Sequence, residues 1–236
     1  MLALFASLVL AGCQGTPAPL QVSSQASAPA KPHSVAVIGD SLSTGLGTTA
    51  KEAWPNLINT DPADPEDPLD LVNAAQNGSG YVTVGSNDST FGKQVAQSVT
   101  ADTELVLFFG SENDRGHTAN QIGTAATAAY AAAKAISPHA ALLVVGLPAY
   151  SNQPEADRLA VRDAVQDAAV AAGATFVDPI AQGWIMGHVD ELIGPDGVHP
   201  SVAGQHFIQG QMEKLIRQSL SQPSLVATTA PASGAK

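Results

Sequence analysis

Ser41 is the residue of this chain that is best placed to do nucleophilic chemistry. It follows a run of four apolar residues, 35–38, that is typical of a short buried parallel strand. Gly39 then allows the backbone to turn sharply. Ser41 is therefore expected just beyond the carboxyl end of a strand, where open α/β sheets carry ligands and catalytic groups. A hydroxyl there can act as a nucleophile if a base reaches it, although this stretch alone is more typical of an ordinary turn.

Four further residues could complete a site for acyl transfer. Gly78 and Asn113 each follow a later apolar run, and Asp196 and His199 lie in a long segment before the last helical pattern. Acyl transfer requires a nucleophile, a base, a group that orients the base, and hydrogen-bond donors for the developing oxyanion. The clusters around these residues supply one candidate for each role. The three-residue spacing of Asp196 and His199 lets both side chains project from one turn of backbone toward one pocket.

The segments that must position these residues alternate between two patterns. Short β-branched and apolar runs indicate strands at 35–38, 69–74, 104–109, 140–145 and 175–177. Apolar residues at helical spacing indicate helices at 50–59, 118–136 and 155–172, and a last helix that Ser201 caps and that carries Ile208, Met212 and Leu215 on one side. Residues 61–68 and 179–200 are expected to be irregular. This alternation predicts an α/β fold, a three-layer α/β/α sandwich with a five-stranded parallel sheet.

The same residues resemble the motifs of the SGNH hydrolases, also called GDSL esterases/lipases. The chain carries Gly-Asp-Ser-Leu at 39–42, Asn-Ala-Ala-Gln-Asn-Gly at 73–78 and Asp-Gly-Val-His at 196–199. A further motif of that family normally reads Gly-x-Asn-Asp, whereas this chain has the longer Gly-Ser-Glu-Asn-Asp at 110–114. No single motif is specific, but four in the family's order, each at a predicted loop, form a strong signal that covers about the whole predicted domain.

The resemblance implies a role for each of these residues. Ser41 would be the nucleophile, and His199 would be the general base that later protonates the leaving alcohol. Asp196 would hold the imidazole tautomer and stabilise the imidazolium. The backbone N–H groups of Ser41 and Gly78, with the side-chain amide of Asn113, would form the oxyanion hole. Glycine at 78 would keep a side chain out of the way of the substrate.

Several alternatives stay open at this stage. Asn113 could lie in a simple turn after a strand, and the longer motif leaves the direction of its amide open. Residues 196–197 could form a turn in which the aspartate bonds its own backbone. Asp40 is expected to be structural. Glu112 and Arg115 could line the pocket or form a solvated pair.

Other kinds of site find less support in the sequence. Ser43 stands where the elbow motif of α/β-hydrolases requires glycine, and residues 39–47 lack the lysine of a nucleotide-binding loop. The histidines at 33, 117, 139, 188 and 206 have no partner at a spacing typical of a metal site. We therefore predict neither a cofactor nor a metal ion, and metal-dependent hydrolysis is kept as a third alternative.

The composition is that of a globular protein with one α/β domain. Of the 236 residues, 44% are hydrophobic and 13% are charged, and the formal net charge is −11. Because a protein that binds nucleic acid needs a basic face for the phosphates, nucleic acid is not expected as a partner.

The first residues indicate export and lipid attachment. Residues 2–10 form an apolar run that is too short to span a bilayer but suits the core of a signal peptide. The run leads into Leu-Ala-Gly-Cys at 10–13, which resembles the lipobox of bacterial lipoproteins, although no lysine or arginine precedes the apolar core. The sequence thus predicts a signal peptide at 1–12, lipid on Cys13 with a flexible tether to 33, the hydrolase domain at 34–219 and a disordered tail at 220–236.

These features together predict an extracytoplasmic serine esterase. It would be a monomer, anchored at the bacterial cell surface or in the periplasm through lipid on Cys13. Its substrates would carry short acyl groups such as acetyl on carbohydrate or other small molecules, since the sequence has no long apolar insertion to form a lipid-binding lid. The alternatives are an acyltransferase that uses the same triad and a surface lipoprotein that binds a ligand without turnover.

Overall fold

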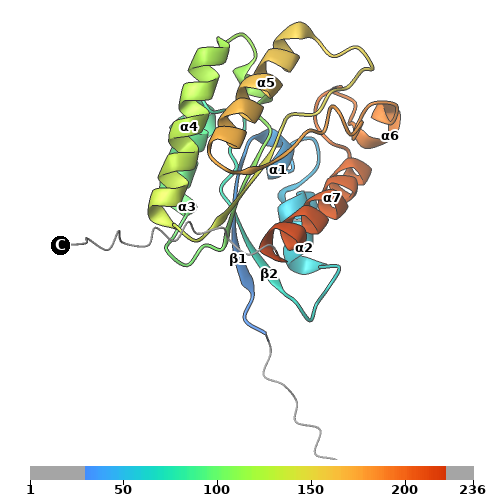
Figure 1. The fold of residues 1–236 in the computed structure, drawn as a ribbon. Helices are drawn as coiled ribbons and strands as arrows, with labels where there is room; N and C mark the ends of the chain where they lie inside the picture. The colour runs from blue at the N-terminus through green and yellow to red at the C-terminus, as the bar shows by residue number, and fades with distance from the viewer. Residues whose placement is uncertain (1–29, 222–236) are drawn as a thin grey trace, which may run out of the picture.

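The computed structural model describes residues 30–221. Its centre is a parallel five-stranded sheet in the order β2-β1-β3-β4-β5 (Figure 1). The strands are β1 (His33–Gly39), β2 (Leu69–Asn73), β3 (Leu105–Phe109), β4 (Ala141–Val145) and β5 (Thr175–Val177). Since β1 pairs in parallel with both β2 and β3, the carboxyl ends of these three strands lie next to one another.

Helices cover both faces of the sheet, because alternate strand residues point to opposite sides. One face is covered by three helices, α3 (Phe91–Ser98), α4 (Ala119–Ile136) and α5 (Ala156–Ala171). The other face is covered by α2 (Trp54–Thr60), α6 (Val189–Leu192) and α7 (Val202–Ser221). Figure 1 shows the two groups on opposite sides of the strands. The predicted three-layer α/β/α sandwich is confirmed.

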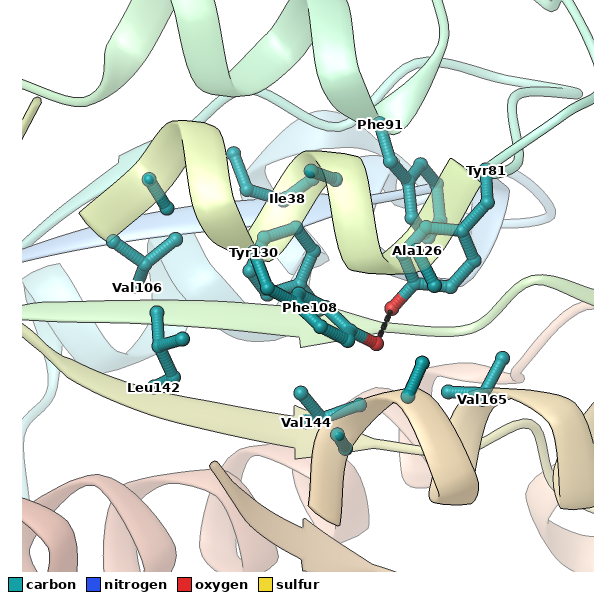
Figure 2. Close-up of a cluster of buried hydrophobic side chains, with 14 of the residues drawn as sticks. Ile38, Tyr81, Phe91, Val106, Phe108, Ala126, Tyr130, Leu142, Val144 and Val165 are labelled. Atoms are coloured by element: carbon teal, nitrogen blue, oxygen red, sulfur yellow. Dashed lines mark hydrogen bonds between the residues drawn. The ribbon is translucent and has the colours of Figure 1, made fainter. Parts of the chain in front are cut away.

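The core between the sheet and α3–α5 is built on aromatic contacts (Figure 2). Even-numbered strand residues such as Ile38 and Phe108 point into it and are fully buried. Tyr81 and Tyr130 meet there, with their hydroxyl oxygens 2.6 Å apart and their ring centroids 5.8 Å apart. This hydrogen bond satisfies two hydroxyl groups that burial would otherwise leave unpaired.

A second core lies between the other face of the sheet and helices α2 and α7. Odd-numbered strand residues such as Val35 and Leu107 are fully buried in it, together with Trp54 and Met212. Strands that are buried on both faces read as continuous apolar runs. This is why β1, β3 and β4 could be recognised from their sequences.

The predicted helix at 50–59 consists of two elements and is wrong as one continuous helix. A 3-10 turn, η1 (Ala50–Glu52), is followed by α2, which begins at Trp54. Ala53 between them is extended, with φ −62° and ψ 133°. Pro55 stands at the second position of α2, where its missing N–H has no intrahelical partner to lose and its fixed φ favours a helix start.

Three helices were not predicted: the single turn α1 (Ser41–Thr44), α3 and α6. The helix α3 lies between β2 and β3, where no element was expected, and its buried face combines Phe91 and Val95 with the polar Gln94, which hides the apolar pattern. The helix α6 is a single turn of four residues within 179–200, which was predicted to be irregular. Four residues are too few for an apolar period to show.

The regular structure extends slightly past the predicted domain limits. The strand β1 begins at His33, and α7 ends at Ser221. The predicted signal peptide, Cys13 and most of the predicted tether and tail lie outside residues 30–221. In this described part of the chain, no helix is both long enough and apolar enough to cross a membrane.

Candidate active site

Ser41 begins α1 (Ser41–Thr44), directly after β1. Asp40 caps this short helix, and its carboxylate accepts the N–H of Leu42 at 2.9 Å. Gly45 ends the helix with φ +81°, a conformation that strains other residues. Ser41 therefore lies at the carboxyl edge of the sheet, the position expected from the sequence.

His199 and Asp196 form a line of contacts with Ser41. His199 Nε2 lies 3.0 Å from Ser41 Oγ, and His199 Nδ1 lies 2.6 Å from Asp196 Oδ2. An Nδ1–H that donates to Asp196 leaves the lone pair of Nε2 facing the Ser41 hydroxyl. Because Ser41 and His199 are 158 residues apart in the sequence, only the fold brings them together.

Asp196 is held in a tight turn of its own. Its Oδ1 accepts the N–H groups of Val198 and His199, each at 3.0 Å, and Gly197 has φ +74°. The hydrogen bond from the His199 side chain, followed by those from the two backbone N–H groups, lowers the pKa of Asp196 well below its usual range. The turn that the sequence offered as an alternative is thus present, and it coexists with the contact to His199.

The segment before α7 fixes the position of His199. The carbonyl of His199 accepts the N–H of Gly194 at 2.8 Å, and Ser201 N–H donates to the carbonyl of Leu192 at 2.9 Å. The loop after α1 packs on the other side, where a Cβ at Gly47 would lie 3.0 Å from the Cβ of His199. Glycine is also favoured at 47 by φ +89°. These contacts restrict the directions that the imidazole can take.

Gly78 lies in a turn that is bonded to both ends of the Ser41 turn. Ser79 Oγ donates to the carbonyl of Gly39 at 2.9 Å, and Thr44 Oγ1 donates to Asn77 Oδ1 at 2.6 Å. Within residues 30–221, the backbone N–H groups of Ser41 and Gly78 donate to no other group. Both N–H groups are therefore free to bind a ligand oxygen.

The glycine at 78 is explained by its backbone conformation. Its φ is +74°, a region that residues with a Cβ rarely adopt. A Cβ at 78 would meet only Gly85 Cα, at an ordinary 3.7 Å, so crowding within the protein does not require glycine there. The crowded position is Gly85, where a Cβ would overlap Ser79 N and Asn77 O. No motif in the sequence marks Gly85.

The side-chain amide of Asn113 lies against the same turn. Its Nδ2 donates one hydrogen to the carbonyl of Ser79 at 2.9 Å, and the second hydrogen of Nδ2 remains for another acceptor. The carbonyl of Asn113 accepts the hydroxyl of Thr83 at 2.7 Å. The three groups expected to bind an oxyanion thus come from turns that contact one another. The Gly78 turn contacts the Ser41 turn on one side and Asn113 on the other.

The extra residue in the 110–114 motif is accommodated by the backbone. Gly110 and Ser111 have φ +110° and +86°, and the 3-10 turn η3 (Glu112–Asp114) follows. Ser111 N–H donates to Asp40 Oδ2 at 3.0 Å, and Ser111 Oγ donates to Asp114 Oδ2 at 2.7 Å. A residue other than glycine is strained at positive φ, and these two hydrogen bonds hold Ser111 there.

Asp40 is fully buried and joins the ends of β1 and β3. One carboxylate oxygen accepts Leu42 N–H, and the other accepts Ser111 N–H. Burial raises the pKa of Asp40 to about 6, and the two backbone hydrogen bonds oppose this rise. The prediction that Asp40 bonds nearby backbone is confirmed.

Two other buried polar residues support the site and were not selected for a role by the sequence analysis. Asp114 accepts the backbone N–H groups of residues 81–83, at distances between 2.6 and 3.1 Å. Gln94, on the unpredicted helix α3, accepts the N–H of Gly39 at 2.8 Å and donates to its carbonyl at 3.0 Å. The last position of the 110–114 motif was a signal for Asp114, whereas nothing in a single sequence marks Gln94.

The remaining candidates do not form a second centre. Glu112 and Arg115 are paired at 3.0 Å, and Glu112 also pairs with the buried Arg158, so the pair is not simply solvated. His117 Nε2 lies 3.1 Å from Thr83 Oγ1. Across the described residues, no three His, Cys, Asp or Glu side chains are grouped so that they could hold a metal ion.

Comparison with known proteins decides the family. The profile of the GDSL-like lipase/acylhydrolase family matches residues 37–207, which include Ser41, Gly78, Asn113, Asp196 and His199. The chain belongs to this family. This GDSL-like hydrolase is 35% identical over 191 residues to the GDSL lipase Rv0518 of Mycobacterium tuberculosis, over 79% of this chain and 82% of that protein. The family makes the GDSL-like hydrolase a carboxylic ester hydrolase.

Solved structures share the fold of the GDSL-like hydrolase at low sequence identity. The structure of TesA matches with a TM-score of 0.63 and 22% identity, over 80% of this chain and 98% of that one. The esterase EstA from Pseudoalteromonas sp. matches with a TM-score of 0.64 and 18% identity, over 80% and 100%. A family two carbohydrate esterase from Clostridium thermocellum matches with a TM-score of 0.61 and 14% identity, over 81% and 66%.

Proposed function

We propose that Ser41, His199 and Asp196 act as a catalytic triad that hydrolyses carboxylic esters through an acyl-enzyme. The proposal rests on the line of contacts from Asp196 through His199 to Ser41, with distances of 2.6 Å and 3.0 Å. Nucleophile and base are within hydrogen-bond reach, and a third group orients the base, which is the arrangement that activates a serine hydroxyl.

In the first half of this mechanism, Ser41 Oγ attacks the ester carbonyl carbon while His199 Nε2 takes the hydroxyl proton. The ionised Asp196 stabilises the imidazolium that forms. His199 then donates the proton to the leaving alcohol, the ester C–O bond breaks, and the acyl group stays on Ser41. In the second half, His199 takes a proton from water, the hydroxide oxygen attacks the acyl carbon, and the acid leaves as Ser41 regains its proton.

The proposed oxyanion hole consists of the N–H groups of Ser41 and Gly78 and the free hydrogen on Asn113 Nδ2. The first two groups are unpaired within the described chain, and the third is held beside the Gly78 turn by the Ser79 carbonyl. Donors that are already in position stabilise the negative charge as it develops, without reorganising. Removing one such donor typically lowers the rate by about 10²–10³-fold.

For the substrate we propose a short acyl group, such as acetyl, on carbohydrate or another small neutral molecule. The net charge of −11 supports a neutral substrate, because like charges repel and an acidic protein disfavours anionic substrates. In the described chain, the loops after β2 and β3 lead into the short turns η2 (Ser86–Asp88) and η3 and not into a long apolar insertion. The similarity to a carbohydrate esterase is consistent with the proposal at the level of the fold alone.

Hydrolysis of p-nitrophenyl esters from acetate to octanoate tests this proposal. We expect the highest kcat/KM on acetate, and we expect Ser41→Ala and His199→Ala each to abolish most of the activity while the fold is retained. Activity that survives Ser41→Ala would exclude Ser41 as the nucleophile. A rate that rises toward octanoate would contradict the short-acyl substrate.

The same assay separates the alternatives. A sugar alcohol added as acceptor that receives the acyl group in preference to water would make the protein an acyltransferase with the same triad. Binding of an ester without turnover by the intact protein would make it a ligand-binding member of the family. Activity lost to a chelator and restored by a metal ion would favour metal-dependent hydrolysis.

We further propose that the protein is anchored outside the cytoplasmic membrane through lipid on Cys13. Support comes from the apolar run and the lipobox-like residues 10–13 in the sequence. Wild type expressed in a bacterium should partition into the membrane fraction and incorporate labelled fatty acid, and Cys13→Ala should do neither. Equal labelling of both proteins would refute the anchor.

A further inference from the structure

Arg158, on α5, is a buried guanidinium that holds two loops at the carboxyl edge of the sheet. Its side chain is only 2% exposed. Arg158 Nη2 lies 2.9 Å from Glu112 Oε1, and Nη1 contacts the second carboxylate oxygen of Glu112. Nη1 also donates to the carbonyl of Pro148 at 2.7 Å. One guanidinium therefore contacts the loop after β3 and the loop after β4.

The first of these loops carries Asn113, and Glu112 comes directly before it. Glu112 lies within the longer motif 110–114, where this chain departs from the usual Gly-x-Asn-Asp of its family. Its carboxylate accepts two bonds from Arg158 and one from Arg115, which lies 3.0 Å away. Two-point contact between a planar guanidinium and a carboxylate fixes orientation as well as distance. Arg158 therefore adds a further anchor to η3, the turn that contains Asn113, beside the bonds that Ser111 and Asn113 make.

The second loop carries Tyr150, whose ring centroid lies 5.0 Å from the Arg158 guanidinium. The Tyr150 hydroxyl is buried and has no hydrogen-bond partner among residues 30–221. The hydroxyl therefore does not fix the ring. Tyr150 is held by packing against the core on the α7 side of the sheet and by its contact with the Arg158 guanidinium.

We propose that Arg158, through Glu112, is a positioning residue for the oxyanion hole. The Arg158–Glu112 pair braces the residue directly before Asn113, so that the Asn113 amide stays in reach of the Ser79 carbonyl, and the contact with Pro148 keeps the β4 loop in register with it. The proposal rests on the proposed function of Asn113. In this proposal, the ion pair between Arg158 on the outer helix α5 and Glu112 affects the rate of the chemical step.

The test measures kcat and KM on p-nitrophenyl acetate for Arg158→Met, Arg158→Lys and Glu112→Gln in the full chain, with thermal unfolding recorded beside them. If the pair aims one oxyanion donor, Arg158→Met should lower kcat by up to about 10²-fold with KM changed by less than about threefold. Arg158→Lys keeps the charge without the planar fork and should restore only part of the rate. Glu112→Gln, which keeps the shape of the side chain, covers the case in which Arg158→Met does not fold.

Arg162→Met is the matched control. Arg162 lies one turn further along α5 and also makes an ion pair, with its Nη1 2.7 Å from Asp178 Oδ2. That pair does not contact the β3 loop, so kcat should stay within about twofold of wild type. Equal losses of kcat in Arg158→Met and Arg162→Met would show a general effect of α5 and overturn the proposal.

A second comparison separates positioning from stability. If Arg158 acts through Asn113, then Arg158→Lys or Glu112→Gln should change kcat little when Asn113→Ala is already present. Effects that multiply in the double variants, or variants that lower the unfolding temperature but leave kcat unchanged, would overturn the proposal.

Hydrogen exchange of the peptides 110–117 and 146–153 tests this inference without relying on esterase activity. If the wild type hydrolyses no ester, the proposed function fails, and exchange still tests the coupling of the loops. Arg158→Met should lower the protection of both peptides, and Arg162→Met should lower neither. Unchanged exchange, or loosening of only one loop, would contradict the coupling.

Discussion

Two carboxylates in opposite surroundings act on the site at the scale of single residues. Asp196 is exposed, and hydrogen bonds lower its pKa, whereas Asp40 is buried, and desolvation raises its pKa. Asp196 contacts the imidazole of His199. Asp40, although it neighbours Ser41 in the sequence, bonds the backbone of Leu42 and Ser111 and so connects two strands.

The burial of Asp40 predicts a pH dependence of stability. Its pKa is about 6 in the folded chain against an ordinary 3.8. Between these values the folded chain binds more protons at Asp40 than the unfolded chain, so the free energy of unfolding falls as the pH rises through this window. The expected loss at this residue is about 2 kcal/mol between pH 4 and pH 7.

Denaturant unfolding of wild type and Asp40→Asn across this pH range measures that loss. Asparagine does not titrate, and subtracting the two curves cancels the other ionisable groups. The stability of wild type relative to Asp40→Asn should therefore decrease toward pH 7. A constant difference, or one that grows with pH, would contradict a raised pKa.

At the scale of elements, the site is made where short turns follow adjacent parallel strands. The turn after β1 holds Ser41, the turn after β2 holds Gly78, and the turn after β3 holds Asn113. These turns bond one another through Ser79, Thr44 and Ser111. The position of one turn therefore depends on the backbone of the next.

Gly85 is a position where a single substitution tests this dependence between the turns. Gly85→Ala should displace the Gly78 turn, because the new methyl group would overlap the backbone of Asn77 and Ser79. A misplacement of about 1 Å can cost about 10²-fold in rate, so kcat/KM on p-nitrophenyl acetate should fall by that order.

Gly92→Ala serves as the control for that substitution. A Cβ at Gly92 would meet only Thr90 Oγ1 at 3.9 Å, and the residue lies in α3. Its activity should be unchanged, and its stability should change by no more than about 1 kcal/mol. Full activity in Gly85→Ala would show that the turn tolerates movement and would contradict this account of the site.

The strands and the Ser41, Asp196 and His199 cluster could be predicted from sequence because each has a local signal. Doubly buried strands read as apolar runs, Ser41 follows the first of them directly, and Asp196 and His199 stand three residues apart in one motif. The helix α3 could not be predicted, since its buried Gln94 interrupts the apolar face in order to bond Gly39. The start of α2 depends on one proline, and the direction of the Asn113 amide depends on contacts with Ser79 that lie far from it in sequence.

At the scale of the whole molecule, the sheet order determines which residues meet. Because β1 lies between β2 and β3, the three turns that follow these strands lie side by side. The helix α7 packs on the opposite face of the sheet from α3–α5, and the segment directly before it brings His199 to Ser41. The buried Arg158 then connects the outer helix α5 to the same edge. The predicted monomer and the predicted lipid anchor stay predictions.

The most direct test of the account is to trap the acyl-enzyme. The protein would be mixed with p-nitrophenyl acetate, quenched in acid within the first turnover, digested, and its peptides weighed by mass spectrometry. The account predicts one added acetyl group, on the peptide and residue of Ser41, that is absent from Ser41→Ala and from protein quenched after the ester is consumed. An acetyl group on another residue that forms and decays at the catalytic rate, or steady hydrolysis that persists in Ser41→Ala, would contradict it.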